Sequence, residues 1–374
     1  MEFYKKVLLS SILIVIVLTG ILVFAAISIA PIFTFTETVP TGNTISINDT
    51  SEGGISGAIA NASNGDIILL DSGNYTGANN TGININKSIK LKGNGPADTV
   101  IIDGQGFTRI FETDNNLYVT FTNITFINAK ASGNGGAINN PNSNTRINFT
   151  NCVFDNNKIV NTTTNNGLGG AIYNEGIVSG LDNCNFTNIS ATSDGGAIYN
   201  DGVVAGLVDC DFTNINAGAN GGAIYNGGLV AGLTECDFTN ISASVDGGAI
   251  YNNDIIVGLT TSNFTNISAG ANGGAIYNGG LVVGLTECNF TNISASVDGV
   301  VIYNNDIIVG LTACNFTNIS TIDNNSVIFD NGLIVGLTDC NFINMPVSNN
   351  ETISNNVNVK GSDSTSISII KTNN

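Results

Sequence analysis

The stretch GGAIYNNDIIVGLTTSNFTNISAGAN, residues 247–272, is one copy of a repeat that runs from about residue 135 to residue 345. Each copy has two landmarks, an isoleucine that follows a pair of small residues and a phenylalanine further along. From Phe186 onward, successive landmark phenylalanines are 26 residues apart. A fixed period in this range is typical of proteins built from stacked structural units, so the repeat decides the fold class.

Three short apolar runs make up each unit, and in residues 247–272 they are AIYN, DIIVGL and NFTNI. Gly, Asn, Asp and Ser separate these runs. Short β-branched runs bounded by turn-forming residues indicate strands rather than helices. Pairing of each strand with its equivalent in the next unit predicts an all-β parallel β-helix with three-strand coils of 26 residues. Its coils should stack about 4.8 Å apart, the usual strand spacing.

Comparison of the copies indicates which side chains point inward. The landmark isoleucine is the same in all eight copies, whereas the next position, usually Tyr, becomes Asn139 in the first copy and Phe329 in the last. From Phe154 onward a cysteine lies two residues before each phenylalanine, except where Ser262 replaces it, and period-2 alternation places both on one face. We predict inward structural ladders of isoleucine, phenylalanine and cysteine, and an outer or corner column of tyrosine. In the central coils the ladder residues are Ile198, Ile224, Ile250 and Ile276; Phe212, Phe238, Phe264 and Phe290; and Cys210, Cys236, Cys288 and Cys314.

The composition excludes several classes of function. The 374-residue chain has 45 glycines, no histidine, a formal net charge of −18, and no Lys or Arg between Lys158 and Lys360. A surface of this kind repels nucleic acid, so we expect no nucleic-acid partner. The C-x₂-C spacing of zinc sites is absent, and we expect neither a metal nor a cofactor. Because the seven cysteines occupy equivalent slots with parallel Cβ vectors, we predict buried free thiols rather than disulfides.

Five segments follow from the pattern along the chain. They are 1–30, a signal peptide or N-terminal membrane anchor; 31–43, a linker; 44–134, an N-terminal cap and irregular first coils; 135–346, the regular 26-residue repeats; and 347–374, a polar C-terminal tail. The apolar run over residues 7–30 is long enough to span a bilayer, and small residues near its end also suit a cleavage site. A short amphipathic helix is expected at Gly53–Ser63. The insertion Asn156–Leu168 is predicted to be a surface loop.

Few residues could carry catalysis. Polysaccharide lyases and hydrolases need clustered acids with a basic partner, and the repeats from Gly167 to Phe342 contain no positive charge. We therefore expect no catalytic residue and no enzyme activity. The alternative is a carbohydrate-active enzyme that acts near residues 100–160. Its candidate residues would be Arg109 and Arg146 with Asp103, Asp114 and Asp155.

Recurring acids and asparagines leave two further questions open. Asp194, Asp246 and Asp298 lie in the turn before the glycine pair, on alternate coils about 10 Å apart, so solvated turn acids are favoured over a calcium ladder. Asparagines of the NFTNIS runs could form inward or corner ladders in which each amide bonds the next, or they could carry glycans, and the sequence does not choose. Acceptor motifs occur at Asn185, Asn188, Asn263, Asn266, Asn289 and Asn292.

The paired motifs GGAIYN and FTNIS resemble the GGAI/FxxN repeats of polymorphic outer-membrane proteins, and the chain looks like the adhesin-like surface proteins of methanogenic archaea. The resemblance covers about residues 44–345, although asparagine follows phenylalanine at +2 (as in Asn188) where the bacterial motif has +3. It implies a right-handed, pectin-lyase-like β-helix displayed on the cell surface. We therefore expect a non-enzymatic adhesin-like rod that makes multipoint contacts with a cell-surface or glycan ligand, with membrane anchoring through residues 7–30 as one option.

Overall fold

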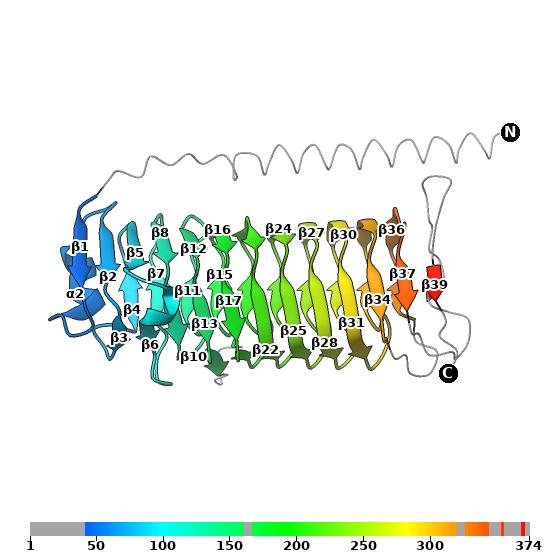
Figure 1. Ribbon diagram of the computed structural model, residues 1–374, viewed down its shortest axis with the longest axis horizontal. Coiled ribbons are helices and arrows are strands. Elements are labelled where there is room, and N and C mark those ends of the chain that lie inside the picture. The colour runs from blue at the N-terminus through cyan, green and yellow to red at the C-terminus, as the bar shows by residue number, and fades with distance from the viewer. Residues whose placement is uncertain (1–41, 161–166, 320–325, 344–352, 355–367, 371–374) are drawn as a thin grey trace. The chain divides into compact units, whose positions relative to one another are not determined.

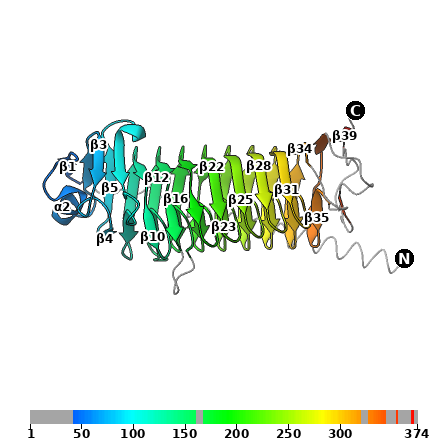
Figure 2. The same cartoon turned by 90° about the horizontal axis from the view of Figure 1, so that it is seen from below.

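Each coil contributes one strand to each of three parallel sheets, as the three apolar runs of the repeat predict. The computed structural model describes residues 42–160, 167–319, 326–343, 353–354 and 368–370. The predicted export segment, nearly all of the linker and most of the C-terminal tail lie outside the described residues. No helix within the described ranges is long and apolar enough to cross a membrane. Every strand pairing between coils is parallel, and Figures 1 and 2 show the coils stacked in chain order. The fold is a parallel β-helix.

Sheet A holds the DIIVGL-type strands. It consists of β1 (Thr44–Ile47), β2 (Ile67–Leu70), β5 (Ile89–Gly93), β8 (Tyr118–Thr122), β12 (Arg146–Thr150), β16 (Ile177–Asp182), β20 (Val203–Val204), β21 (Leu207–Val208), β24 (Leu229–Thr234), β27 (Ile255–Thr260), β30 (Leu281–Thr286), β33 (Ile307–Thr312) and β36 (Leu333–Val335).

Sheet B holds the NFTNI-type strands. It consists of β3 (Gly73–Thr76), β6 (Val100–Asp103), β9 (Thr125–Ile127), β10 (Lys130–Ser132), β13 (Val153–Asp155), β14 (Lys158–Val160), β17 (Asn185–Thr187), β18 (Ser190–Ala191), β22 (Asp211–Ala217), β25 (Asp237–Ala243), β28 (Asn263–Ala269), β31 (Asn289–Ala295), β34 (Asn315–Thr317), β37 (Asn341–Ile343) and β39 (Ser368–Ile370).

Sheet C holds the IYN-type strands. It consists of β4 (Ile83–Ile85), β7 (Phe111–Thr113), β11 (Ile138–Asn140), β15 (Ile172–Asn174), β19 (Ile198–Asn200), β23 (Ile224–Asn226), β26 (Ile250–Asn252), β29 (Ile276–Asn278), β32 (Ile302–Asn304), β35 (Ile328–Asp330) and β38 (Ile353–Ser354).

Equivalent residues of successive coils lie directly above one another in the core. Phe238 pairs in register with Phe264, and Ile250 pairs with Ile276. The nine landmark phenylalanines from Phe126 to Phe342 stack with ring centroids 4.7–5.1 Å apart. The landmark isoleucines and all seven cysteines are also buried, and the cysteines are free thiols. The structure thus places every predicted ladder residue of the central coils inside the solenoid.

A buried asparagine ladder, which the sequence did not indicate, runs beside these apolar columns. It consists of the third residue of each IYN strand, and Asn226 is typical in being 0% exposed. Its Nδ2 donates to Asn252 Oδ1 at 2.8 Å, and its Oδ1 accepts from Asn200 Nδ2 at 2.9 Å. Buried amides are tolerated only when hydrogen-bonded, and the stack of coils supplies each partner. The ladder runs through Asn140, Asn174, Asn200, Asn226, Asn252, Asn278 and Asn304 and ends at Asp330.

The N-terminal end of the stack carries the expected short helix, α2 (Gly54–Asn61), and a 3₁₀ turn, η1 (Ala97–Thr99), follows β5. Ile55 and Ile59 of α2, one turn apart, are buried against the first coils. Lys87 Nζ donates to three carbonyls at the helix C-terminus, at 2.8–2.9 Å. A cation at this end also complements the helix dipole.

Two local features concern the turns. In the glycine pair before β26, Gly247 takes a left-handed conformation with φ +65°, while its neighbour Gly248 has no positive φ. The insertion Asn156–Leu168 is not a loop throughout. Residues Lys158–Val160 form β14, which pairs with β10, because Ile159 is apolar and β-branched and packs in a small cluster with two alanines. Residues 161–166 lie outside the described residues.

Candidate functional site

The basic and acidic residues near 100–160 do not come together. Arg109 precedes β7 of sheet C, where it pairs with Glu112 and donates to two backbone carbonyls of the next coil, at 2.8 and 3.0 Å. Burial lowers the pKa of Arg109, and the charge of Glu112 opposes that shift. Arg146 instead begins β12 of sheet A, where its guanidinium lies 5.4 Å from the centroid of the Tyr118 ring. The two arginines therefore belong to different faces of the solenoid.

The three candidate aspartates are also engaged singly. Each accepts a hydrogen bond from an asparagine of another coil; Asp103 and Asp155 lie in strands of sheet B, whereas Asp114 follows β7 of sheet C. The donors are Asn128 to Asp103 at 3.0 Å, Asn84 to Asp114 at 2.8 Å and Asn188 to Asp155 at 3.0 Å. These acids act as members of polar ladders in the structure, and the geometry does not assemble an acid–base pair from the predicted residues.

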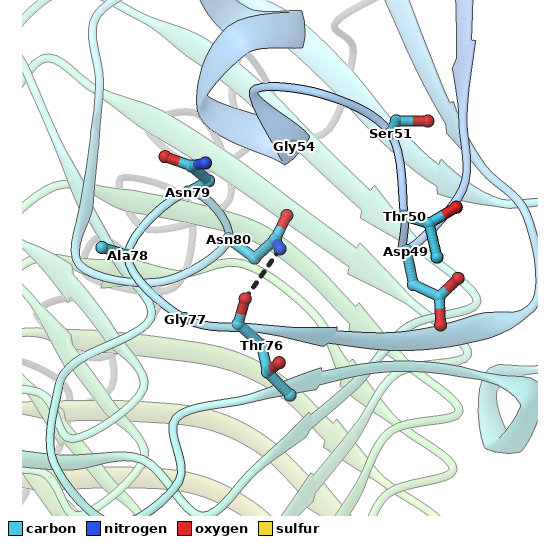
Figure 3. A pocket seen from close by; sticks show the side chains of 9 residues that line it. All are labelled: Asp49, Thr50, Ser51, Gly54, Thr76, Gly77, Ala78, Asn79 and Asn80. Carbon is cyan, nitrogen blue, oxygen red and sulfur yellow. Dashed lines mark hydrogen bonds between the residues drawn. The ribbon is translucent and has the colours of Figure 1, made fainter.

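Two shallow pockets occur in the N-terminal coils. One, of about 440 Å³, is lined by Asn116, Tyr118, Ser143, Asn144, Arg146 and Ile177, a set with no carboxylate. The other, of about 280 Å³, lies beside α2 and is shown in Figure 3. In that pocket Asn80 donates from Nδ2 to Thr76 O at 2.8 Å and accepts from the Ile55 backbone N–H at 3.0 Å. Its amide therefore secures the first turn of the helix.

The outer face of sheet B carries two exposed asparagine ladders. In β28, Asn263 and Asn266 point outward, and Asn266 takes a left-handed conformation with φ +55°, which asparagine tolerates. Asn289 Nδ2 donates to Asn263 Oδ1 at 2.8 Å, and Asn266 Nδ2 donates to Asn240 Oδ1 at 3.1 Å. Asparagine ladders therefore exist in the NFTNI runs, but they lie on the outer surface, so the inward position considered for them is wrong. Glycosylation at these positions stays a prediction.

The turn acids form a further ladder and are not simply solvated, which corrects the favoured interpretation of them. Aspartate and asparagine alternate along this ladder, and each side-chain oxygen accepts the backbone N–H of the equivalent residue in the next coil. Asp246 Oδ1 accepts from the Asn272 N–H at 2.7 Å, and Asn272 Oδ1 accepts from the Asp298 N–H at 3.1 Å. Among the described residues, no three His, Cys, Asp or Glu side chains are grouped so as to hold a metal ion.

The tyrosines form a stacked strip on the outside of sheet C. From Tyr173 to Phe329 the ring centroids are 4.7–5.3 Å apart. Most of the rings are half-buried by their neighbours. Burial, with the nearby charges of Tyr251 and Asp246, raises the pKa of Tyr277 to about 12. The strip therefore presents neutral hydroxyls at physiological pH.

The outer face of sheet A carries an apolar stripe that sequence analysis missed. Within DIIVGL, Ile255 and Val257 point outward and are half-buried, while Ile256 between them is fully buried. The signal was available, because three consecutive apolar residues in a strand must place at least one on the outer face. The apolar stripe consists of the half-buried row Ile177, Val203, Leu229, Ile255, Leu281, Ile307 and Leu333 and the row Val257, Val283, Val309 and Val335.

The repeat matches a known family model. Residues 151–175, 183–201 and 235–253 match the Chlamydia polymorphic membrane protein repeat. Each matched segment contains one or two strands of sheet B and one strand of sheet C, so the match does not include the apolar stripe. A search of curated proteins found no match.

A comparison with solved structures found one similar chain. A point mutant of the PL6 family alginate lyase AlyGC aligns with a TM-score of 0.43 at 13% sequence identity. The alignment covers 87% of this chain and 53% of the lyase chain, so the chain spans about half the length of that protein.

Proposed function

We propose that this chain is a non-enzymatic, adhesin-like protein of the cell surface that binds cells or glycans through many weak contacts. The observation that carries the proposal is the outer face of sheet B, where exposed asparagines with neighbouring threonines repeat coil after coil in register. A ligand with its own repeat could form the same polar contact on each coil, and such contacts add strongly when they are linked. The match to a polymorphic membrane protein repeat supports surface display.

The alternative, a carbohydrate-active enzyme near residues 100–160, is less well supported by the geometry. Arg109 is held by Glu112 and by backbone carbonyls, and Asp103, Asp114 and Asp155 lie apart in separate ladders. We include in the proposal that residues 7–30 direct export, either as a cleaved signal or as a retained anchor, and that the chain is related to the adhesin-like proteins of methanogens.

A paired set of variants tests which face binds. Asn263→Lys with Asn289→Lys changes the exposed ladder of sheet B, and Asn253→Lys with Asn305→Lys makes the same change in the turn between sheets C and A. Binding of the full chain to an array of glycans and cells should weaken several-fold in the first variant and stay unchanged in the second. Equal binding by all three proteins would overturn the assignment to sheet B.

Activity assays separate the two functions. We expect the full chain to release no product from uronate polymers such as pectate or alginate, with or without calcium. Deletion of residues 217–268, which removes two coils and rejoins equivalent positions, should lower the apparent affinity for the bound glycan or cell. Two results would favour an N-terminal active site instead. One is product formation that is lost in Arg146→Ala. The other is binding that survives the deletion undiminished but is abolished by Arg109→Ala.

A further inference from the structure

The apolar stripe of sheet A is a surface that the proposed binding function does not use. It has no partner among the residues that the structure describes. The longer row of the apolar stripe crosses seven coils, with a coil spacing of about 4.8 Å along the solenoid. The stripe is about four residues wide along the strands, at about 3.3 Å each, so the area of the stripe is about 400 Å². Contiguous apolar patches of this size on a protein surface are frequently interaction sites.

Charges are distributed unevenly along the same face. Beside the apolar stripe, the edges of sheet A carry the exposed acids Asp201, Asp209, Glu235, Asp254, Glu287, Asp306 and Asp339. In the N-terminal half of the face, Lys90, Lys92 and Arg146 project outward, with acids at the edges that include Asp71, Asp114, Glu175 and Asp182. Both halves of sheet A therefore have acids at their edges, but the three outward cations lie only in the N-terminal half, and most of the apolar stripe lies in the C-terminal half.

We propose that two copies of the chain pair through sheet A, face to face and with their coils running in opposite directions. A two-fold axis parallel to the strands, midway between β16 and β20, produces this arrangement. It places the three cations of each copy over the C-terminal half of the other, which has only acids beside its apolar stripe, whereas pairing in the same direction would place those acids over acids. Sheets packed face to face lie about 10 Å apart, which leaves the outward side chains in contact.

The register of this pair follows from the strand order. Twelve strands lie on the path from β1 to β36, so the axis puts β2 opposite β33 and β5 opposite β30. Ile67 and Leu69 of β2 then face the apolar stripe at β33, and Lys92 of β5 comes near Glu287, which follows β30. The whole face, eleven coil steps of about 4.8 Å by about 20 Å of strand, would bury roughly 2,000 Å² in total, as stable interfaces do.

Cysteine cross-linking tests the orientation. All seven native cysteines are buried, so a single introduced surface thiol is selective. In the full chain on cells, Val203→Cys beside the axis should cross-link to its own copy with a bis-maleimide that spans about 10 Å. Val309→Cys alone should not, whereas a mixture of Val309→Cys and Ile67→Cys proteins should give a mixed dimer. Self-cross-linking of Val309→Cys, or none in any combination, would overturn the antiparallel pair.

Charge variants test the interface itself by sedimentation of the full chain in mild detergent. Val257→Asp should weaken dimerisation at least tenfold, while Thr265→Asp adds the same charge to sheet B of the same coil and should leave it unchanged. Lys92→Glu should also weaken the pair, and adding Glu287→Lys should restore it. A monomer at micromolar concentration would overturn the proposal, and so would failure of Glu287→Lys to restore the dimer. Either result is also the one expected if residues 7–30 or a lipid surface, rather than a second copy, cover the apolar stripe.

Discussion

The buried asparagine ladder makes a strong prediction about stability. Replacing Asn226 with alanine removes a side chain that contacts both neighbouring coils. Its Nδ2 donates to Gly228 O, Asn252 Oδ1 and Ile255 O at 2.8–3.0 Å. Its Oδ1 accepts from Asn200 Nδ2 at 2.9 Å and from the Gly228 N–H at 3.3 Å. Because the amide is fully buried, water cannot replace these partners in the folded chain.

The expected loss follows from the number of bonds. The two amide hydrogens are shared among three acceptors, so the five contacts amount to about four full hydrogen bonds. At roughly 1 kcal/mol each, their removal should lower the free energy of unfolding by about 3–5 kcal/mol. The matched control is Asn214→Gly in the exposed ladder. There two bonds of 3.2 Å are open to water, and glycine tolerates the positive φ, so we expect a loss of less than about 1 kcal/mol.

Urea denaturation followed by circular dichroism measures both variants. The midpoint of Asn226→Ala should fall well below that of the native chain, and the midpoint of Asn214→Gly should stay close to it. Equal shifts for the two variants would show that the inner ladder contributes no more than the outer one and would refute the reasoning.

Four further predictions concern the core and the charges. Phe238→Ala should cost about 3–5 kcal/mol as a buried truncation, and Tyr251→Asn far less, which comparison of their urea midpoints checks. The cysteines should resist alkylation in the native chain and all react after unfolding, as mass spectrometry would show. Asp330→Asn should raise the midpoint, because Asp330 Oδ2 is buried without a hydrogen-bond partner at the end of the amide ladder. Burial and the neighbouring carboxylate of Asp237 raise the pKa of Asp211. The folded chain therefore binds this proton more tightly than the unfolded chain, and the resulting contribution to stability is complete below the unfolded pKa and is lost as pH rises through the folded pKa. The melting temperature should increase when pH is lowered from neutral toward 4.

The sequence predicted the parts of the fold that every copy repeats. Ile250 and Phe264 could be placed inside the solenoid because their positions do not vary between copies, and the structure puts them there. Asn252 was missed because asparagine alone is typical of turns, and only the stacked neighbour 26 residues away makes its burial favourable. The outward direction of Ile255 was missed because an apolar residue is expected inside, and strand periodicity matters only once the phase of the strand is known.

The candidate site was less predictable for a related reason. Arg109 and Asp103 attract attention as chemically active types, but their partners, Glu112 and Asn128, are set by the coil register. Which residues share a face of the solenoid can be read from the sequence only when the positions of the turns in each coil are known. The left-handed conformation of residues such as Asn266 determines that placement locally.

The direction of the buried amide bonds has a consequence for the gene. Each asparagine of this ladder donates toward the next coil, so every coil offers a donor on one side and an acceptor on the other. Residues 217–268 and 269–320 differ at only six positions, so such blocks are interchangeable. Gain or loss of one 26-residue unit changes the length by about 4.8 Å and restores the same bonds at the junction. The number of repeats therefore sets the length of the β-helix. Unequal recombination can change that length in fixed steps, while each remaining coil keeps its side chains and its hydrogen bonds.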